Sequence, residues 1–480
     1  MTIADPKPYP AMKDSGVPWL GNVPEHWEMR RGKWLFRKMD RPVQDSDDVV
    51  TCFRDGVVTL RKNRRVRGFT ESLKEIGYQG ICRGDLVIHA MDAFAGAIGV
   101  ADSDGKGTPV YSVCEPKPTA NAHYYAYMLR EMSRSQWIQA LAKGIRERST
   151  DFRFNGFGSQ PVPLPPLPEQ VAIVRYLDNM DRRIRKYIRV KQKLIKLLEE
   201  QKQAIIHRAV TRGLNPNIRL KPSGVEWFGD VPEPWEVGRL RNIADMRVSN
   251  IDKHTKEDEI SIRLCNYVDV YKNERITKPV RFMSATATSE EIARFRLELD
   301  DVLITKDSES WNDIGVPALV EHSAPDLVCG YHLALLRPFR NLMKGGYLLR
   351  AMQSPAVAYQ FHIKANGVTR YGLSHTAIKS TWLPVPPLTE QVAIVLFLDE
   401  ATERIAAVIS HAHQEIGLLR EYRIRLIADV VTGKLDVREA AAWLPDEPGE
   451  PEPIDEPDDL NGVEEDKADD IDEALEEAIT

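Results

Sequence analysis

The sequence predicts a mixed α/β fold of the α+β kind, in which two long antiparallel helices join two lobes in a pseudo-two-fold arrangement. Residues 165–178 recur 221 residues later as 386–399, with 11 of 14 positions identical. Residues 15–28 recur 208 residues later, with 10 of 14 positions identical. The stretches between these repeats hardly match. One chain therefore carries two copies of a frame that encloses two different contents.

The repeats divide the chain into seven segments. A length of 480 residues exceeds one hydrophobic core and suits two domains with connecting elements. The segments are a leading segment (1–28), a first variable lobe (29–162), a central constant region with a long helix (163–213), a repeated leading segment (214–236), a second variable lobe (237–383), a distal constant region with a long helix (384–444) and an acidic, disordered tail (445–480).

Each constant region is expected to form a helix of about 40 residues, roughly 60 Å long. Prolines precede both helices and suit a first turn, and Gly213 and Gly433 are good terminators. Apolar residues at a spacing of about 3.5 indicate packing on one partner helix, and each helix is the simplest partner of the other. The alternative is that each helix packs only on its own lobe. The expected stripes are Ile173, Leu177, Met180, Ile184, Tyr187, Leu194, Leu198 and Ile205, and Ile394, Leu398, Ala401, Ile405, Val408, Leu419, Tyr422 and Leu426, with breaks at Lys191, Gln201, Ala412 and Glu415.

The two lobes look like one α/β fold that has diverged. Short β-like runs are expected at 49–53, 85–89, 260–264 and 301–305, with a helix near the end of each lobe. Residues 84–88 (GDLVI) are similar to residues 300–304 (DDVLI), and residues 127–130 (YMLR) to residues 347–350 (YLLR). Divergence within a shared fold is what two different ligands would require.

Composition argues against several classes of protein. No apolar run is long enough to span a membrane, and the N-terminus lacks the apolar core of a signal peptide, so a cytoplasmic protein is expected. The five cysteines form no CxxC pair, which argues against a zinc ribbon or a disulfide framework. His411 and His413 are interpreted as surface residues. No metal site is predicted.

The net charge of −6 hides two opposite parts. Residues 446–480 contain 17 acidic residues and one lysine, so this tail carries −16 and the remaining chain +10. Such a tail buries too little apolar surface to fold. A mildly basic body suits a nucleic-acid binder, although many other proteins share this balance.

Signals of catalysis are weak. Residues 154–158 (FNGFG) match a loop that can hold S-adenosylmethionine, but a proline-rich run follows where a helix should begin, so the match is interpreted as a coincidence in a loop. Residues 105–108 (GKGT) lack the leading glycine of a phosphate loop. No nucleophile elbow or HExxH motif occurs, so no catalytic residue is predicted.

Basic side chains near glycine loops suggest contacts to DNA, because arginine and backbone N–H groups bind phosphates and arginine also reads guanine. A solvated basic face is the alternative for each of them. The predicted DNA-binding residues are Arg61, Lys62, Arg64, Arg65, Arg67, Lys143, Gly144, Arg146 and Arg148 in the first lobe, and Lys306, Gly367, Thr369, Arg370 and Tyr371 in the second.

These motifs give the ordered chain a resemblance to the DNA-specificity subunit of type I restriction–modification systems. The repeated runs PPLPEQVAIVRYLD and PPLTEQVAIVLFLD resemble the constant regions of that family. The GDLVI and DDVLI strands and the loops at Gly144 and Gly367 resemble its target-recognition domains. The acidic tail beyond about residue 444 lies outside the resemblance.

The resemblance implies a non-catalytic subunit whose two lobes each read one half of a split, asymmetric site in double-stranded DNA. The helices would set the spacing and dock two modification subunits, with Glu169, Gln170, Glu390 and Gln391 as partner-binding residues. This chain would bind no cofactor. The partner subunits would hold S-adenosylmethionine for adenine methylation, and restriction subunits would hold ATP and magnesium.

Two other functions remain open at this point. A methyltransferase would bind S-adenosylmethionine unaided. A coiled-coil protein adaptor would show no preference among duplex sequences.

Overall fold

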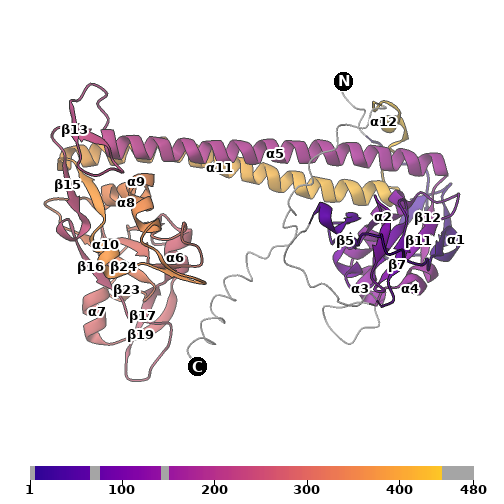
Figure 1. Cartoon of the computed structure of the whole chain (residues 1–480), viewed down its shortest axis with the longest axis horizontal. Helices are drawn as coiled ribbons and strands as arrows, with labels where there is room; N and C mark the ends of the chain where they lie inside the picture. The colour runs from indigo at the N-terminus through magenta and orange to yellow at the C-terminus, as the bar shows by residue number, and fades with distance from the viewer. Residues whose placement is uncertain (1–5, 65–75, 142–150, 446–480) are drawn as a thin grey trace. The chain divides into compact units, whose positions relative to one another are not determined.

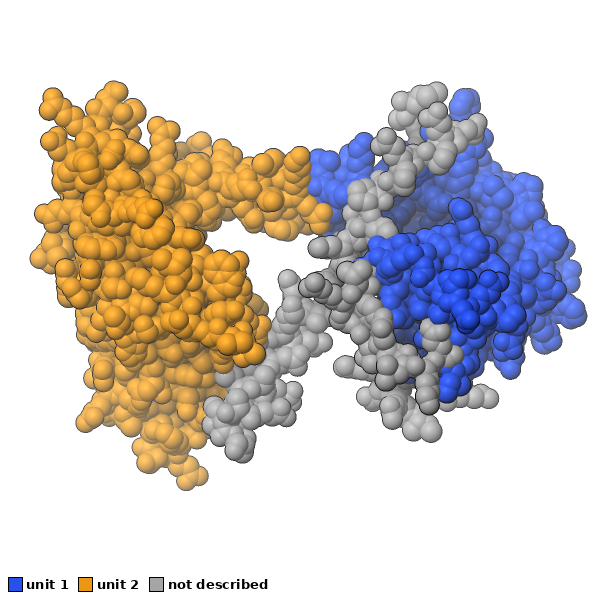
Figure 2. All heavy atoms as spheres, in the orientation of Figure 1, with its two compact units in different colours: residues 1–190, 415–480 blue, residues 191–414 orange. Residues whose placement is uncertain are grey.

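The computed structural model describes residues 6–64, 76–141 and 151–445, which form two compact units (Figure 2). Unit 1 holds the described residues up to 190 and from 415 onward, and unit 2 holds residues 191–414. Each unit therefore contains one lobe and a part of each long helix. The predicted fold class, mixed α/β with two lobes joined by long helices, is confirmed.

The two long helices are α5 (Leu167–Arg212) and α11 (Leu388–Val431), of 46 and 44 residues (Figure 1). Each begins directly after a pair of prolines, which cannot extend a preceding helix but fit a first turn. Gly213 and Gly433 follow the helix ends with positive φ angles of 69° and 77°. The left-handed backbone at these glycines ends each helix, as the sequence predicted.

The helices run antiparallel, because opposite ends of them share a core in each unit. In unit 1, Ile173 near the start of α5 lies in the same core as Val430 near the end of α11. In unit 2, Val210 near the end of α5 lies in the same core as Ile394 near the start of α11. Each unit also packs its lobe against both helices. The helices therefore pack on each other as predicted, and the alternative, in which each helix packs only on its own lobe, is wrong.

The buried stripe on α5 differs from the predicted one. Tyr187 and Leu194 are exposed, with 57% and 37% of their surface accessible. The residues that directly follow them, Ile188 and Ile195, are buried instead. On α11, Val408 and Tyr422 are likewise exposed, and Ala412, which was predicted to break the stripe, is buried and continues it. The predicted register was therefore wrong at these positions.

The first lobe is built on a four-stranded antiparallel sheet in the order β4-β11-β8-β9. Helix α2 (Ala122–Arg134) packs on this sheet, and Asn121 caps the helix by accepting from the backbone N–H groups of His123 and Tyr124. The predicted strands at 49–53 and 85–89 are confirmed as β5 and β8. The strands are β4 (Phe36–Lys38), β5 (Val50–Cys52), β6 (Val58–Leu60), β8 (Leu86–His89), β9 (Ile98–Val100) and β11 (Tyr111–Pro116).

The second lobe has a five-stranded sheet in the order β16-β24-β20-β22-β18, in which only β18 and β22 pair in parallel. A three-stranded sheet, β19-β17-β23, and helix α8 (Gly345–Gln353) accompany it. The predicted strands at 260–264 and 301–305 are confirmed as β17 and β20. The strands are β16 (Ala244–Val248), β17 (Ile260–Cys265), β18 (Arg275–Ile276), β19 (Met283–Ala287), β20 (Val302–Thr305), β22 (Pro317–Val320), β23 (Leu327–Cys329) and β24 (Leu333–Pro338).

A repeated strand pair closes each lobe. Strand β3 (Glu28–Arg31) pairs with β12 (Pro161–Leu164), and β15 (Glu236–Arg239) pairs with β27 (Trp382–Val385). The other elements are β1 (Met12–Asp14), β2 (Asn22–Pro24), α1 (Gly32–Leu35), η1 (Arg61–Asn63), β7 (Gln79–Ile81), η2 (Ala93–Ala95), β10 (Gly105–Gly107), α3 (Trp137–Leu141), α4 (Phe154–Ser159), β13 (Leu220–Pro222), β14 (Asp230–Pro232), η3 (Leu240–Asn242), α6 (Tyr267–Lys272), α7 (Ser289–Phe295), α9 (Pro355–His362), α10 (His375–Lys379) and α12 (Arg438–Ala442).

The FNGFG motif is not the loop that was predicted. Its residues form helix α4, in which Phe157 is fully buried beside Gly32 of α1. The motif is therefore part of the packing of the first lobe. No described helix is both long enough and apolar enough to cross a membrane.

Candidate nucleic-acid interface

A repeated clamp of tryptophan, glutamate and glycine fixes each lobe to the long helices. In unit 1, Trp27 is fully buried and donates from Nε1 to Oε1 of Glu169 in the first turn of α5, at 2.9 Å. Tyr9 and His26 also bind this carboxylate. In unit 2, Trp235 donates to Glu390 at the start of α11, at 2.8 Å. The repeated leading segments are thus anchored on the helix starts.

The glycine of each clamp comes from the end of the opposite helix. A Cβ on Gly433 would meet the ring of Pro24 and lie 2.9 Å from the Trp27 ring, and one on Gly213 would lie 3.2 Å from the Trp235 ring. Each of these positions requires glycine for two reasons, the positive φ angle and the close approach of the tryptophan.

The glutamine that follows each clamp glutamate binds backbone groups of the lobe. Gln170 donates to the carbonyl oxygens of Thr119 and Pro165 and accepts from the N–H of Asn121. In unit 2, Gln391 donates to Leu342 and Pro386 and accepts from the N–H of Lys344, which is the capping residue of α8. These satisfied amides set where α2 and α8 begin.

The four residues predicted to bind partner subunits make these hydrogen bonds within the chain. Glu169 is buried, and Gln170 and Gln391 have no accessible surface at all, whereas Glu390 is half-buried. A direct contact between the buried side chains and another subunit is not expected from the structure. The repeated Glu-Gln pair is explained by the attachment of lobe to helix.

The repeated contacts correct the alignment of α2 with α8. Tyr124 donates its hydroxyl hydrogen to the carbonyl of Val431, and Tyr347 does the same to Val210. Tyr124 is therefore the counterpart of Tyr347, and the predicted correspondence of YMLR with YLLR is wrong by three residues. The counterpart of Arg350 is Tyr127, and the counterpart of Arg130 is Gln353. The predicted alignment was shifted by about one helical turn. Residues three apart lie on the same face of a helix, so Tyr124 and Tyr127 of α2 both fit the pattern.

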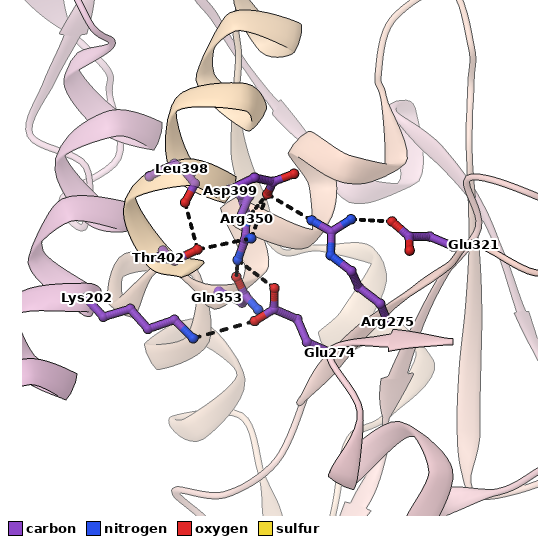
Figure 3. A network of polar contacts seen from close by, with 9 residues as sticks. All are labelled: Lys202, Glu274, Arg275, Glu321, Arg350, Gln353, Leu398, Asp399 and Thr402. Carbon is purple, nitrogen blue, oxygen red and sulfur yellow. Dashed lines mark hydrogen bonds and ion pairs between the residues drawn. The ribbon is translucent and has the colours of Figure 1, made fainter. Parts of the chain in front are cut away.

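Arg350 is the centre of an ion-pair network in unit 2 (Figure 3). Its side chain is only 3% exposed and pairs with Glu274 at 2.8 Å and Asp399 at 2.7 Å. Glu274 also pairs with Lys202 of α5, and Arg275 bridges Asp399 to Glu321. Because the buried cation is fully paired, this network locks the second lobe, α5 and α11 together.

The structure brings the predicted residues of the second lobe together on a small three-stranded sheet. Strands β25 (Asn366–Gly367) and β26 (Tyr371–Gly372) form a hairpin that pairs with β21 (Asp307–Ser308). Lys306 directly precedes β21, and its carbonyl accepts from the N–H of Leu373, at 2.8 Å. All five predicted residues, Lys306, Gly367, Thr369, Arg370 and Tyr371, therefore lie at this hairpin.

The hairpin has a charged base and an exposed tip. At the base, Asp307 accepts from Lys306 at 2.7 Å and contacts Nδ1 of His332 at 2.8 Å. Burial opposes ionisation of Asp307, but these hydrogen bonds hold its pKa below the ordinary value. At the tip, residues 366–370 are exposed. Gly367 has a φ of +150°, a backbone conformation that a residue with a side chain adopts only with strain. An exposed tip that carries Thr369 and Arg370 can contact bases or phosphates.

The first lobe shares with the helices a cleft of about 1380 Å³ in unit 1. Eight arginines line it against three aspartates, Asp55, Asp92 and Asp181, and Phe53, Phe94 and Tyr127 add aromatic rings. The cleft is therefore strongly basic. The arginines are Arg54, Arg61, Arg64, Arg130, Arg134, Arg185, Arg420 and Arg423.

The predicted basic residues of the first lobe are only partly placed here. Arg61 and Arg64 line the cleft, and Arg64 is largely buried, paired with Asp55 at 2.5 Å and stacked on Phe53. Lys62 is exposed and pairs with Asp48. The predictions for Arg65, Arg67, Lys143, Gly144, Arg146 and Arg148 lie outside the described residues.

Sequence reasoning missed the arginines that the helices and α2 contribute to the cleft. Arg130 and Arg134 lie on α2, Arg185 on α5, and Arg420 and Arg423 on α11. They are scattered over three segments, so no local run of basic residues marks them. Within the described ranges, no group of histidines, cysteines and carboxylates is placed to hold a metal ion.

Comparison with known proteins shows which class of protein this chain resembles. Residues 232–416, which contain the second lobe and more than half of α11, match the family model described as the type I restriction modification DNA specificity domain. A solved structure titled "Structural basis underlying complex assembly and conformational transition of the type I R-M system" has the same fold, with a TM-score of 0.61, 16% identity, and coverage of 85% of this chain and 98% of the other.

Two curated relatives come from Methanocaldococcus jannaschii. The putative type I restriction enzyme MjaX specificity subunit is 26% identical over 182 residues, which are 38% of this chain and 42% of that protein. The type I restriction enzyme MjaVIII specificity subunit is 26% identical over 146 residues, 30% of this chain and 31% of that protein. The matches thus span less than half of either relative. The resemblance of this chain to type I restriction–modification specificity subunits is confirmed.

Proposed function

We propose that the chain is the specificity subunit of a type I restriction–modification complex and binds double-stranded DNA in a sequence-specific manner. The observation that carries the proposal is the repeated frame around unlike lobes. The same clamp holds each lobe on the helices, whereas the exposed features differ, a hairpin in the second lobe and a basic cleft beside the first. A repeated attachment that holds two different lobes suits a DNA site with two unlike halves.

The partners follow from the same proposal. The complex would contain two modification subunits that use S-adenosylmethionine to methylate adenine, and restriction subunits that use ATP and magnesium. This chain would supply no catalytic group and bind no cofactor, and it would act in the cytoplasm. The exposed apolar side chains of the long helices, among them Val171, Leu396 and Leu418, offer surfaces on which such subunits could dock.

Selection from a random pool of duplexes tests the proposal. The full chain, assembled with its methyltransferase partners, should enrich a sequence with two defined parts separated by a spacer of constant length. Sequencing of the bound duplexes measures this. If the bound pool stays as random as the input, the chain is not a sequence-reading subunit.

The hairpin tip provides the first mutational prediction. Arg370→Ala should relax or lose recognition at one position of one half of the selected sequence, at a cost of about 1–3 kcal/mol, while the other half stays unchanged. Arg241→Ala, which removes an exposed arginine of the same lobe outside the hairpin, is the matched control and should leave both halves intact. Equal selection by the wild type and Arg370→Ala would remove the hairpin from the interface.

A further inference from the structure

The two units differ at one repeated position, and the difference leaves a cation in the cleft of unit 1. In unit 2, Asp399 of α11 pairs with Arg350 of α8. In unit 1, the corresponding Asp178 of α5 accepts instead from the hydroxyl of Tyr127, at 2.7 Å. The arginine of this helix lies one turn later, at Arg130, where unit 2 has the neutral Gln353.

Arg130 is held in place but has no counter-ion among the residues that the structure describes. Within the described part of the chain, no hydrogen bond or ion pair with its guanidinium is found, although Arg350 has two carboxylates. A Cβ on Gly56 would lie 2.7 Å from the central carbon of this guanidinium, so the glycine makes room for it. Asp55, the carboxylate that acts on Arg130, is already paired with Arg64.

The surroundings of Arg130 favour an anion. Arg134 and Arg423 act on it as like charges, and both line the same cleft. Desolvation by burial lowers the pKa of Arg130 from its ordinary value, which shows that its charge is poorly compensated. A half-buried cation without a partner is costly, and an anion bound in the cleft would remove this cost.

We propose that the arginine-lined cleft of unit 1 binds phosphate groups, with Arg130 as the central ligand. Guanidinium groups bind phosphate through parallel, charge-assisted hydrogen bonds, and several arginines around one cleft can share one phosphate or a row of them. The phosphate can belong to the DNA backbone or to a free phosphate compound. If the phosphate belongs to DNA, the inference rests on the proposed function, and unit 1 makes a sequence-independent contact to the DNA backbone. In unit 2 the arginine of α8, Arg350, is already paired with carboxylates in the ion-pair network.

Thermal unfolding of the full chain with sodium pyrophosphate tests the site. At matched ionic strength against sodium chloride, pyrophosphate should raise the melting temperature of the wild type, because a ligand that binds only the folded state stabilises it. Arg130→Gln should weaken the pyrophosphate affinity by about tenfold or more. Arg130→Lys, which keeps the charge but loses the planar fork, should fall between them.

The control is Arg37→Gln, which removes an exposed arginine of the same unit that pairs with Glu115 outside the cleft. It should respond to pyrophosphate as the wild type does. A circular dichroism spectrum of each variant in chloride verifies the fold. The proposal is overturned if pyrophosphate fails to stabilise the wild type, or if it stabilises Arg130→Gln equally.

Binding of a non-specific duplex at several salt concentrations then identifies the source of the phosphate. If the DNA backbone occupies the cleft, Arg130→Gln should reduce the slope of log affinity against log salt by about one unit. A lost pyrophosphate response with an unchanged slope would assign the cleft to a free phosphate compound. Because neither measurement depends on sequence preference, failure of the cleft and failure of the proposed function can be told apart.

Discussion

Replacing Glu169 by alanine is expected to destabilise unit 1 by about 3–5 kcal/mol, because it leaves buried donors without an acceptor. The indole N–H of Trp27 and the hydroxyl of Tyr9 both donate to this carboxylate, and both side chains are buried. The substitution also removes a negative charge from the first turn of α5, where it interacts favourably with the helix dipole. Denaturant unfolding measures the loss.

Glu200→Ala is the matched control for this prediction, because Glu200 lies exposed on the same helix. It should change the free energy of unfolding by no more than about 0.5 kcal/mol. Glu169→Gln should fall between the two, since its amide oxygen still accepts one hydrogen bond. Should Glu169→Ala unfold at the denaturant concentration of the control, the clamp would contribute nothing to the attachment of the lobe.

Replacing Gly433 by alanine is expected to cost about 2–4 kcal/mol. The residue has a φ of +77°, and an added Cβ would collide with the ring of Pro24 and approach Trp27 to 2.9 Å. Pro24 and the Trp27 ring would both have to shift to make room. The same unfolding measurement applies.

Gly417→Ala on α11 provides the contrasting case. This glycine is helical, and nothing lies within 4 Å of an added Cβ. The substitution should therefore stabilise the chain by about 0.5–1 kcal/mol through the better helix propensity of alanine. If both glycines tolerate alanine equally, neither the positive φ nor the tryptophan contact at Gly433 is important.

The frame of the fold could be predicted because identical residues in two places imply identical structure. The prolines before and the glycines after each long helix marked its ends to within a few residues. The register of the buried stripe could not be predicted, because Tyr187 and Ile188 are both apolar and only the facing helix decides which is buried. For the same reason the three-residue shift between α2 and α8 became visible only through the hydrogen bonds of Tyr124 and Tyr347.

The site could be predicted where its residues are close in sequence. The residues of the hairpin tip, 367–371, were identified together, and only the placement of Lys306 beside them required the fold. The cleft of unit 1 could not be found in this way. Its arginines come from the first lobe, α2, α5 and α11, and charges so far apart in sequence form a group only after folding.

The central claim is that two independent lobes each read one half of a DNA site. Mapping of methylated adenines in a host that carries the chain with the methyltransferase subunits that we propose as its partners tests this most directly. Residues 237–383 are exchanged for the corresponding lobe of a related specificity subunit, and the methylated sequence is compared before and after. The account predicts that one half of the methylated sequence changes and the other half is retained. A change in both halves, or methylation that does not depend on the exchanged lobe, would contradict it.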